Sequence, residues 1–550
     1  MRIDPARNTA REERGKLMSL RFLTAHFAVS PQIRVEDLPA LKEQGFSGII
    51  CTRPDGEEKD QPGVADLGVA AEKCGLAFAY IPVRMGATPD AHSVSVMRQT
   101  LAEMTGPDNT GKVLAYCRSG RRAADLYELA STQKEEKPAG AQRFDVVVVG
   151  GGAGGLACAA SLLRRRPGLL VAVVEPSTEH YYQPGWTLVG GGVFTAQQTR
   201  RSEVGLIPAR ANWIRQAVTA FLPEQNRIEL GDGTQIAYEA LVVATGLKLD
   251  WAAIPGLAET LGKNGVTSNY RYDLAPYTWE LVSKLEEGKA LFTQPPMPIK
   301  CAGAPQKAMY LACDAWRRRG VLGRVQVEFD TATPSLFGVA DFVPALMDYI
   351  KGYSIDLNLK SRLVAVDGER KIATFERVTE AGTARVERAF DMLHVVPPQT
   401  APDVIRSSPL AGADGFVSVH PDTMQHTQYA NVFAVGDVAG TSNAKTAAAA
   451  RKQAPVVVEN LIAQLSGRKP DAVYDGYGGC PLTVERGKIV LAEFGYGGKL
   501  LPTLPGWLLD GKKPTRLAWF LKEQIMPRLY WDFMLKGREF LVRPARKTEG

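Results

Sequence analysis

The feature that most restricts the fold is a run of glycines directly after a strand of valines. Residues 145–155 read DVVVVGGGAGG, and a helical pattern, LACAASLLRRR, follows them. Gly150 permits a tight turn, Gly152 lets the backbone approach a pyrophosphate, and Gly155 lets the helix pack closely on the strand. A second strand, LLVAVVE, ends on Glu175, whose carboxylate would bind ribose hydroxyls. This order of strand, glycines, helix, strand and acid predicts a dinucleotide-binding βαβ unit.

Two later segments indicate that the dinucleotide is FAD. LVVATG, at 241–246, predicts the short strand and turn of flavoproteins that bind two dinucleotides, and NVFAVGD, at 431–437, resembles the second FAD motif. The helix expected after it would point its N-terminus at the flavin and stabilise the negative charge of the reduced ring. We therefore expect FAD to be held by Gly150, Gly152, Gly155, Glu175, Thr245, Gly246, Gly436, Asp437, Lys445 and Thr446.

Strand-like and helical segments alternate along most of the 550 residues, which predicts an α/β protein. The region from 144 to 465 resembles the glutathione-reductase-like flavoproteins, and this implies two Rossmann-like dinucleotide-binding domains of the FAD/NAD-linked reductase type. A small α/β domain would precede them, and an amphipathic helical tail would follow. The expected parts are the small domain (19–130), a linker (131–143), the FAD-binding domain (144–260 and 386–465), the NAD-like domain (261–385) and a C-terminal region (466–550).

The NAD-like domain lacks the glycine motif that a nicotinamide dinucleotide needs. Its first strand, KALFTQ, leads into PPMPIKCAGAPQKAMYLACDAW, which places Cys301 on the turn between strand and helix. Lys300 and the N-terminus of the following helix would lower the pKa of this thiol and favour the reactive thiolate. The sequence therefore predicts that NAD(P)H does not bind and that Cys301 reacts. A buried structural cysteine is the alternative.

Five segments resemble the sulfide:quinone oxidoreductases of the mitochondrial type: HYYQPGWTLVGGG, KCAGAPQK, MLHVVPP, NAKTAAA and YDGYGGCPL. The resemblance implies that sulfide is oxidised at a cysteine pair beside the flavin, that Cys301 is the first cysteine, and that a membrane quinone accepts the electrons. It also implies a second redox cysteine directly after the glycine and aspartate of the second FAD motif. Val438 stands there, so we expect Cys301 to lack this partner. It would then begin as a persulfide or an adduct, or use Cys480 or Cys117.

The small N-terminal domain carries a second candidate cysteine. LAYCRSGRRAADLYELA has the order strand, loop, helix, and the loop amides could surround the sulfur of Cys117. Arg122 completes a Cys-x4-Arg spacing that resembles the rhodanese sulfurtransferases, and the rest of the domain resembles a small bacterial family with a phosphatase-like fold. Sulfur transfer, with glutathione or another small thiol as acceptor, is one hypothesis. A phosphatase with Asp55 or Asp90 as general acid and an inactive domain are the others.

Charge and cysteine usage exclude several classes of function. The net charge is +7, but Lys and Arg form no long tracts, so we expect no nucleic-acid partner. The seven cysteines are scattered without a CxxC pair, which predicts reduced thiols and no metal site. The first residues mix both charge signs and predict no signal peptide. No apolar run reaches the roughly 18 residues that a spanning helix needs.

The last 45 residues mix aromatic and basic side chains, which is typical of a helix that lies in the bilayer interface. We therefore expect a peripheral protein on the cytoplasmic face of a bacterial inner membrane. The alternative is a helical pair packed on the body of the protein. The oligomeric state stays open, with a homodimer as one option.

The leading hypothesis is FAD-dependent oxidation of sulfide to sulfane sulfur, with electrons passed to a membrane quinone. The N-terminal domain would transfer the sulfane sulfur. In one version of this scheme the sulfur is captured on Cys301. An NADH:quinone-type oxidoreductase is a second hypothesis, and a flavin-containing sulfane-sulfur carrier or sensor with little turnover is a third.

Overall fold

A computed structural model describes residues 19–58, 60–86, 89–104, 111–132, 142–380 and 382–547. The chain divides into two compact units, Met1–Gly140 and Ala141–Gly550. Each unit is described here by itself. Most of the linker expected at 131–143, and the first 18 residues, lie outside the described residues.

The N-terminal unit is a five-stranded sheet with helices on both faces. The strand order is β1-β2-β5-β3-β4, and all neighbours except β1 and β2 run parallel. Successive residues of one strand enter opposite cores: Phe27 and Val29 pack with one cluster, whereas Ala28 packs with the other. The elements are β1 (Arg21–Phe22), β2 (Phe27–Ser30), α2 (Leu38–Glu43), β3 (Phe46–Cys51), α3 (Val64–Lys73), β4 (Ala77–Tyr80), α4 (Ala91–Met104), β5 (Lys112–Tyr116) and α5 (Arg121–Thr132).

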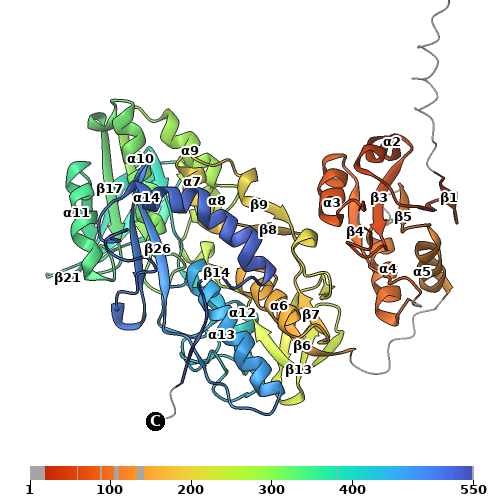
Figure 1. The fold of residues 1–550 in the computed structure, drawn as a ribbon. Coiled ribbons are helices and arrows are strands. Elements are labelled where there is room, and N and C mark those ends of the chain that lie inside the picture. The colour runs from red at the N-terminus through yellow and green to blue at the C-terminus, as the bar shows by residue number, and fades with distance from the viewer. Residues whose placement is uncertain are drawn as a thin grey trace, which may run out of the picture. The chain divides into compact units, whose positions relative to one another are not determined.

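The larger unit is built around a seven-stranded sheet with the order β10-β7-β6-β13-β12-β11, and β24 pairs with β13. The valines of β6 form the centre of its hydrophobic core. Helices α6 and α13, which follow the two FAD motifs, pack against each other beside this sheet (Figure 1). The elements are β6 (Gln142–Val149), α6 (Ala153–Arg165), β7 (Val171–Val174), β10 (Asn212–Ile214), β11 (Val218–Leu222), β12 (Arg227–Leu230), β13 (Gln235–Val243), β24 (Val432–Ala434) and α13 (Ala447–Leu465).

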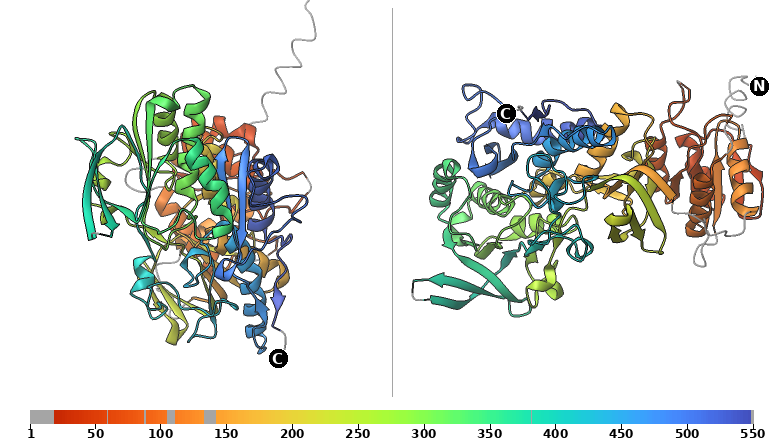
Figure 2. Two further views of the ribbon diagram at one scale, coloured as in Figure 1. Left: turned by 90° about the vertical axis from the view of Figure 1, so that its left-hand side faces the viewer. Right: turned by 90° about the horizontal axis from the view of Figure 1, so that it is seen from below.

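A second, fully parallel sheet has the order β15-β22-β16-β17-β18. A three-stranded antiparallel sheet of β19, β20 and β21 is inserted in the chain between β18 and β22, and its last two strands project from the body (Figure 2). The elements are β15 (Val266–Thr267), α9 (Ala275–Lys284), β16 (Gly288–Gln294), α10 (Ala304–Arg318), β17 (Val325–Thr331), α11 (Val343–Gly352), β18 (Asp356–Leu359), β19 (Ser361–Asp367), β20 (Ile372–Thr379), β21 (Gly382–Ala389) and β22 (Met392–His394).

Shorter elements connect these sheets. They are β8 (Glu179–Tyr181), α7 (Trp186–Gly190), β9 (Arg200–Ser202), β14 (Lys248–Leu249), α8 (Leu257–Thr260), β23 (Gln399–Thr400) and α12 (Asp403–Arg406).

The C-terminal region consists of a hairpin and a helical segment. The hairpin is formed by β26 (Gly478–Glu485) and β27 (Lys488–Phe494), and it packs on α10. The helical segment runs from α14 (Arg516–Phe520) through α15 (Met526–Arg528) to Lys536, and β25 (Ala472–Val473) pairs with β28 (Ala545–Arg546). Within the described residues, no helix is both long enough and apolar enough to cross a bilayer.

The α/β class expected from the sequence is confirmed, since strands lie at VVVV, VAVV, ALVV, KALFTQ, VQVEFDT and VFA. The helical tail is also present, but one of its faces is buried against the body. Tyr530, Trp531, Met534 and Leu535 belong to the core of the FAD-type sheet, and Tyr530 Oη lies 2.7 Å from His180 Nε2.

Candidate functional site

Cys301 lies on the turn between β16 and α10, and the surrounding backbone fixes it there. Its φ is +49°, a left-handed conformation that is uncommon for a residue with a side chain. The Cys301 amide donates to the carbonyl of Lys445 at 2.7 Å, and its own carbonyl accepts from the amide of Ala304 at 2.7 Å. The Tyr270 hydroxyl lies 3.1 Å from the same carbonyl. A strained conformation held by this many contacts is typical of functional positions.

Cys480, on strand β26, is the neighbour of Cys301. The two thiols share a hydrogen bond that lowers the pKa of Cys301 and raises the pKa of Cys480. No disulfide joins them in the structure. Gly303 makes this approach possible, because a Cβ atom at this position would lie 2.6 Å from the sulfur of Cys480. The turn that would hold a dinucleotide in an NAD-binding domain here makes room for the sulfur of Cys480 instead.

Cys301 has no cysteine partner at 438, as expected, because Val438 stands there, fully buried in the core of the FAD-type sheet. Of the alternatives that the sequence left open, Cys480 lies beside Cys301. The partner comes instead from the hairpin some 40 residues later in the chain, where Cys480 is 3% exposed and packs against α10.

Two buried lysines supply positive charge to the cysteine pair. Lys307, one turn into α10, places Nζ 3.2 Å from the sulfur of Cys301. After the contact with Cys480, this ammonium is the main group that lowers the pKa of Cys301. Burial and the positive charge of Lys307 lower the pKa of Lys522, in the C-terminal helical segment, to about 7. Lys522 Nζ donates to the carbonyl of Pro184 at 2.8 Å.

Lys300 has a different position from the one expected. Its Nζ donates to Gln183 Oε1 at 2.8 Å and lies 5.9 Å from the centre of the Trp186 ring. Burial lowers the pKa of Lys300, while the charges of Asp437 and Cys301 oppose that effect. The ammonium that contacts the Cys301 sulfur is therefore Lys307 rather than the preceding residue.

The residues of the first FAD motif form an open cradle that fits a dinucleotide. Gly155 packs so closely on the preceding turn that a Cβ atom would lie 1.9 Å from the carbonyl oxygen of Gly150. No atom would lie within 4 Å of a Cβ at Gly152, which begins α6. Glu175 lies beside this turn and accepts from the Gly151 amide at 2.7 Å. The buried Thr245 hydroxyl has no partner within the described residues, as expected of a group that faces a ligand.

The segment that follows the second FAD motif contacts the Cys301 turn, because the Cys301 amide donates to the carbonyl of Lys445. Gly436 has a φ of +79°, and Asp437 follows it in the turn. Burial raises the pKa of Asp437, and the ammonium groups of Lys300 and Lys445 oppose that rise. Lys445 Nζ donates to the carbonyl of Asp437 at 2.8 Å. Thr446 caps α13 by accepting from the amide of Ala449 at 3.1 Å. The helix N-terminus that we expect at the flavin is therefore adjacent to the Cys301 turn.

The loop of Cys117 in the N-terminal unit has the geometry of an anion-binding or sulfur-binding loop. The Gly120 amide donates to the sulfur at 3.1 Å. Burial alone would raise the pKa of Cys117, but four backbone amides of the loop outweigh it and the pKa is lowered. Both expected acids have local structural partners: Asp55 Oδ1 accepts from the amide of Val64 at 3.1 Å, and Asp90 Oδ1 accepts from the amide of Ser93 at 2.7 Å.

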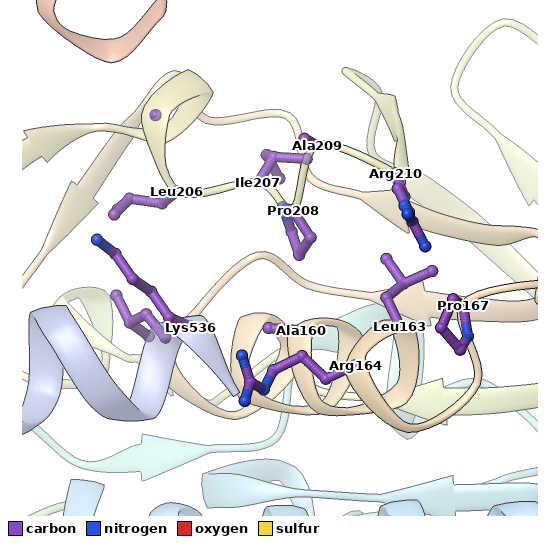
Figure 3. A pocket seen from close by; sticks show the side chains of 12 residues that line it. Ala160, Leu163, Arg164, Pro167, Leu206, Ile207, Pro208, Ala209, Arg210 and Lys536 are labelled. Atoms are coloured by element: carbon purple, nitrogen blue, oxygen red, sulfur yellow. The ribbon is translucent and has the colours of Figure 1, made fainter. Parts of the chain in front are cut away.

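A surface cleft of about 490 Å³ lies between α6, the 205–210 loop and the end of the C-terminal helical segment (Figure 3). Apolar side chains form its walls, and three basic residues, Arg164, Arg210 and Lys536, line it. Its lining residues do not include Cys301, Cys480, Lys307 or Lys522. This cleft is therefore separate from the candidate site.

Comparison with known proteins divides the chain in the same way. Residues 144–454 match the pyridine nucleotide-disulphide oxidoreductase family, and residues 19–134 match the phosphatase-like domain of beta-lactamase hydrolase-like proteins. The mitochondrial sulfide:quinone oxidoreductase of Dictyostelium discoideum is 44% identical over 383 residues, which are 68% of this chain and 83% of that protein. The chain belongs to the sulfide:quinone oxidoreductase family. It carries a phosphatase-like domain at its N-terminus.

Further relatives agree with this family. The mitochondrial sulfide:quinone oxidoreductase of Mus musculus is 38% identical over 66% of this chain and 80% of its own. The crystal structure of the sulfide:quinone oxidoreductase from Aquifex aeolicus has the same fold, with a TM-score of 0.61 at 20% identity over 72% of this chain and 92% of its own. A beta-lactamase hydrolase-like protein of Agrobacterium fabrum is 37% identical to the N-terminal part, which spans 23% of that relative.

The sequence motifs name Cys480 only as one of two possible partners of Cys301, and they miss Lys307 and Lys522. Lys307 lies in the segment KCAGAPQK, but the motif alone assigns it no role. Lys307 follows Cys301 by six residues, a spacing that the turn before α10 brings into contact. No motif marks Lys522, because in the sequence it is one of several basic residues in the segment that is typical of an interfacial helix.

We predict that Lys307→Met slows alkylation of Cys301 at pH 7. Removal of the ammonium raises the pKa of the thiol. Each unit by which this pKa exceeds the pH of the assay lowers the thiolate fraction by about tenfold. The measurement is the rate of iodoacetamide labelling of Cys301, followed by peptide mass spectrometry. Lys307→Arg retains the charge and should keep a rate closer to that of the wild type. Equal rates for Lys307→Met and the wild type would contradict the assignment.

Proposed function

We propose that this chain oxidises sulfide to sulfane sulfur at the Cys301–Cys480 pair and passes the electrons to a membrane quinone by way of FAD. The observation that carries the proposal is the second cysteine next to the first, in a buried pocket with the ammonium of Lys307. The two relatives that are 44% and 38% identical to this chain are named for sulfide and quinone, which supports the same substrates here.

The two FAD motifs would hold the cofactor. The glycine turn at 150–155 and the N-terminus of α6 would contact the pyrophosphate, Glu175 would bind the adenosine ribose, and the second motif would bind the ribityl chain and flavin. FAD, when bound, supplies the two-electron acceptor for cysteine oxidation and the donor for quinone reduction.

The position of the Lys307 ammonium beside the Cys301 sulfur sets the direction that we propose for sulfide attack. In the oxidised pair, hydrosulfide would attack the sulfur of Cys480. A new S–S bond forms there, the Cys301–Cys480 bond breaks, and Cys301 leaves as a thiolate. The thiol of lower pKa is the better leaving group, and Lys307 is placed to stabilise its negative charge. We therefore place the sulfane sulfur on Cys480 rather than on Cys301.

An acceptor thiolate would then remove the outer sulfur of the Cys480 persulfide. Its attack forms the S–S bond of a new small-molecule persulfide and leaves Cys480 as a thiolate. Return of the two cysteines to a disulfide releases the two electrons that sulfide oxidation provides. Within this scheme Cys301, Cys480 and Lys307 act on the sulfur, and Tyr270 holds the Cys301 turn in place.

We predict that Cys301→Ser and Cys480→Ser each abolish reduction of the flavin by sulfide, because either change removes the disulfide electrophile. The measurement is anaerobic stopped-flow absorbance of the flavin after addition of sulfide, followed by addition of a quinone. Cys313→Ala is the control, because Cys313 is fully buried in the core around α10. Wild-type rates in Cys480→Ser would contradict the pair. Flavin reduction by NADH instead of sulfide would favour the NADH:quinone hypothesis.

We propose that the protein binds the membrane surface through exposed apolar side chains of the C-terminal region. The segment buries one face, but Trp507 is 85% exposed and Phe520 is 50% exposed. Leu508 and Leu517 are exposed as well. Aromatic and aliphatic side chains with nearby basic residues are typical of interfacial binding. The cytoplasmic face of a bacterial inner membrane remains the proposed location.

We predict that Trp507→Ser combined with Phe520→Ser lowers the binding of the protein to liposomes by about tenfold or more, since each large apolar side chain contributes about 1.5–3 kcal/mol when it leaves water. Reduction of a long-chain quinone should slow, whereas reduction of a soluble dye should not. The control is Val378→Ser with Val386→Ser, on the projecting strands β20 and β21. Removal of the whole segment is a poorer test because it would open the core around Trp531.

We propose sulfane-sulfur transfer as the activity of the N-terminal domain. The lowered pKa of Cys117 and the amides around its sulfur support a reactive thiolate. Asp55 and Asp90 each accept a hydrogen bond from a nearby backbone amide. We therefore assign neither of them as the general acid of a phosphatase.

We predict that Cys117→Ser leaves sulfide-dependent flavin reduction at the wild-type rate and lowers the formation of glutathione persulfide. The reason is that each unit has its own cysteine and its own core. The two measurements are flavin absorbance and chromatographic detection of the labelled persulfide. Loss of flavin reduction in this variant would show that both cysteines serve one reaction.

A further inference from the structure

The guanidinium of Arg122, which completes the Cys117 loop, is already occupied by a carboxylate. Its two terminal nitrogens donate to the two oxygens of Glu57 at 2.7 and 2.8 Å, and one of them also donates to the carbonyl of Val83 at 2.7 Å. Arg122 and Glu57 are both nearly buried, with side-chain exposures of 12% and 15%. Such a two-pronged pair is the strongest arrangement that arginine makes with an anion.

The other arginines around the loop are also paired with acids. Arg53, whose side chain is 3% exposed, donates to Glu57 at 2.9 Å and to Glu58 at 2.7 Å. Arg118, which follows Cys117 directly, forms an ion pair with Glu58 at 2.9 Å. Hydrogen bonds from Arg122 lower the pKa of Glu57, so this carboxylate is charged at neutral pH. Three guanidinium groups therefore pair with two carboxylates, and one of them, Arg122, also lies near Cys117.

We propose that the Glu57–Arg122 pair makes the Cys117 loop selective for sulfane sulfur carried by a thiol, as in a small-molecule persulfide, over sulfur or phosphorus carried on an oxyanion group. The inference rests on the proposed sulfur transfer and names its donor. The disfavoured substrates are thiosulfate and phosphate esters, which both present a doubly charged group with three terminal oxygens.

The favoured reaction needs no cation for an oxyanion. The Cys117 thiolate attacks the outer sulfur of R–S–SH, a new S–S bond forms on Cys117, the S–S bond of the donor breaks, and R–S⁻ leaves. An acceptor thiolate then attacks the outer sulfur of the Cys117 persulfide and restores the Cys117 thiolate. No net oxidation occurs in either step, and the loop amides stabilise the thiolate before and after transfer.

An oxyanion donor would meet a different electrostatic situation. Its terminal oxygens would use the N–H groups of Arg122, and three of these five groups already donate to Glu57 and Val83. Binding would require the oxyanion to displace this carboxylate or to lie beside it, and two anions at such a distance repel each other. Glu57 thus acts as a specificity-determining residue, because it lies between the loop arginine and any further anion.

The test compares donors in the full-length protein. Initial rates of persulfide transfer to glutathione would be measured with a glutathione persulfide donor and with thiosulfate, in the absence of sulfide and quinone, and Cys117→Ser would give the background. We expect the wild type to prefer the persulfide and to be insensitive to millimolar inorganic phosphate. Glu57→Gln should shift the preference toward thiosulfate by about tenfold, which is the ratio that corresponds to an interaction worth one pKa unit. It should also make the reaction sensitive to phosphate. Glu72→Gln removes one negative charge from the exposed surface of α3 and should change neither property.

The outcomes separate this inference from the proposed function. If the wild type uses thiosulfate as fast as the persulfide, or if Glu57→Gln keeps the wild-type preference, sulfur transfer stands and the role of Glu57 is wrong. If neither donor transfers sulfur through Cys117, the sulfur-transfer proposal fails and this inference with it. Should Glu57→Gln not fold, the donor preference and phosphate sensitivity of the wild type still decide the matter.

Discussion

The contact between the Cys301 sulfur and the Lys307 ammonium is the interaction on which the larger unit's chemistry depends. A buried ammonium is unfavourable unless an anion compensates it, and a buried thiol ionises only with difficulty. At 3.2 Å the Cys301 thiolate compensates the charge of the Lys307 ammonium, and the ammonium stabilises the thiolate. The fold provides the contact by ending β16 in a turn at Cys301 and starting α10 a few residues later, so that Lys307 comes back toward the turn. Burial then makes the pair strong, because water does not screen it.

The sequence carried enough information for the fold and for one half of the site. The glycine fingerprint, the acid after the second strand and the second FAD motif each depend on residues close together in the chain, so their geometry follows from local rules. Cys301 was found for the same reason, since a strand and a helix define its turn. Cys480 was quoted but not placed, because its contact with Cys301 depends on how a distant hairpin packs on α10. Val438 excluded one position for a second sulfur, but nothing local in the sequence could choose between the remaining alternatives, Cys480 and Cys117.

The C-terminal segment combines two roles that seemed to exclude each other. Its composition suits a bilayer interface, and its packing suits a protein core. The proposed membrane role and the observed packing are compatible, because different side chains serve each: Trp531 is buried with the FAD-type sheet, whereas Trp507 and Phe520 are exposed. Lys522 belongs to neither group. The segment carries this lysine to the cysteine pocket, where its carbonyl partner is Pro184. The region that we propose as the membrane contact therefore also contributes a lysine to the cysteine pocket.

The charges of this pocket change with the oxidation state of the cysteines. In the reduced pair, one thiolate faces two lysines. Burial and the repulsion between Lys307 and Lys522 lower the pKa of Lys522 to about 7. A disulfide carries no charge, so oxidation removes the anion and leaves Lys307 without its partner. In the proposed reaction, the pocket would then be positive and buried at the moment when it must attract an anion, hydrosulfide, to an uncharged disulfide. After attack the new Cys301 thiolate would restore the balance. Lys307 would thus serve both the entry of the nucleophile and the departure of the leaving group, and Lys522 would yield its proton when only one positive charge is needed.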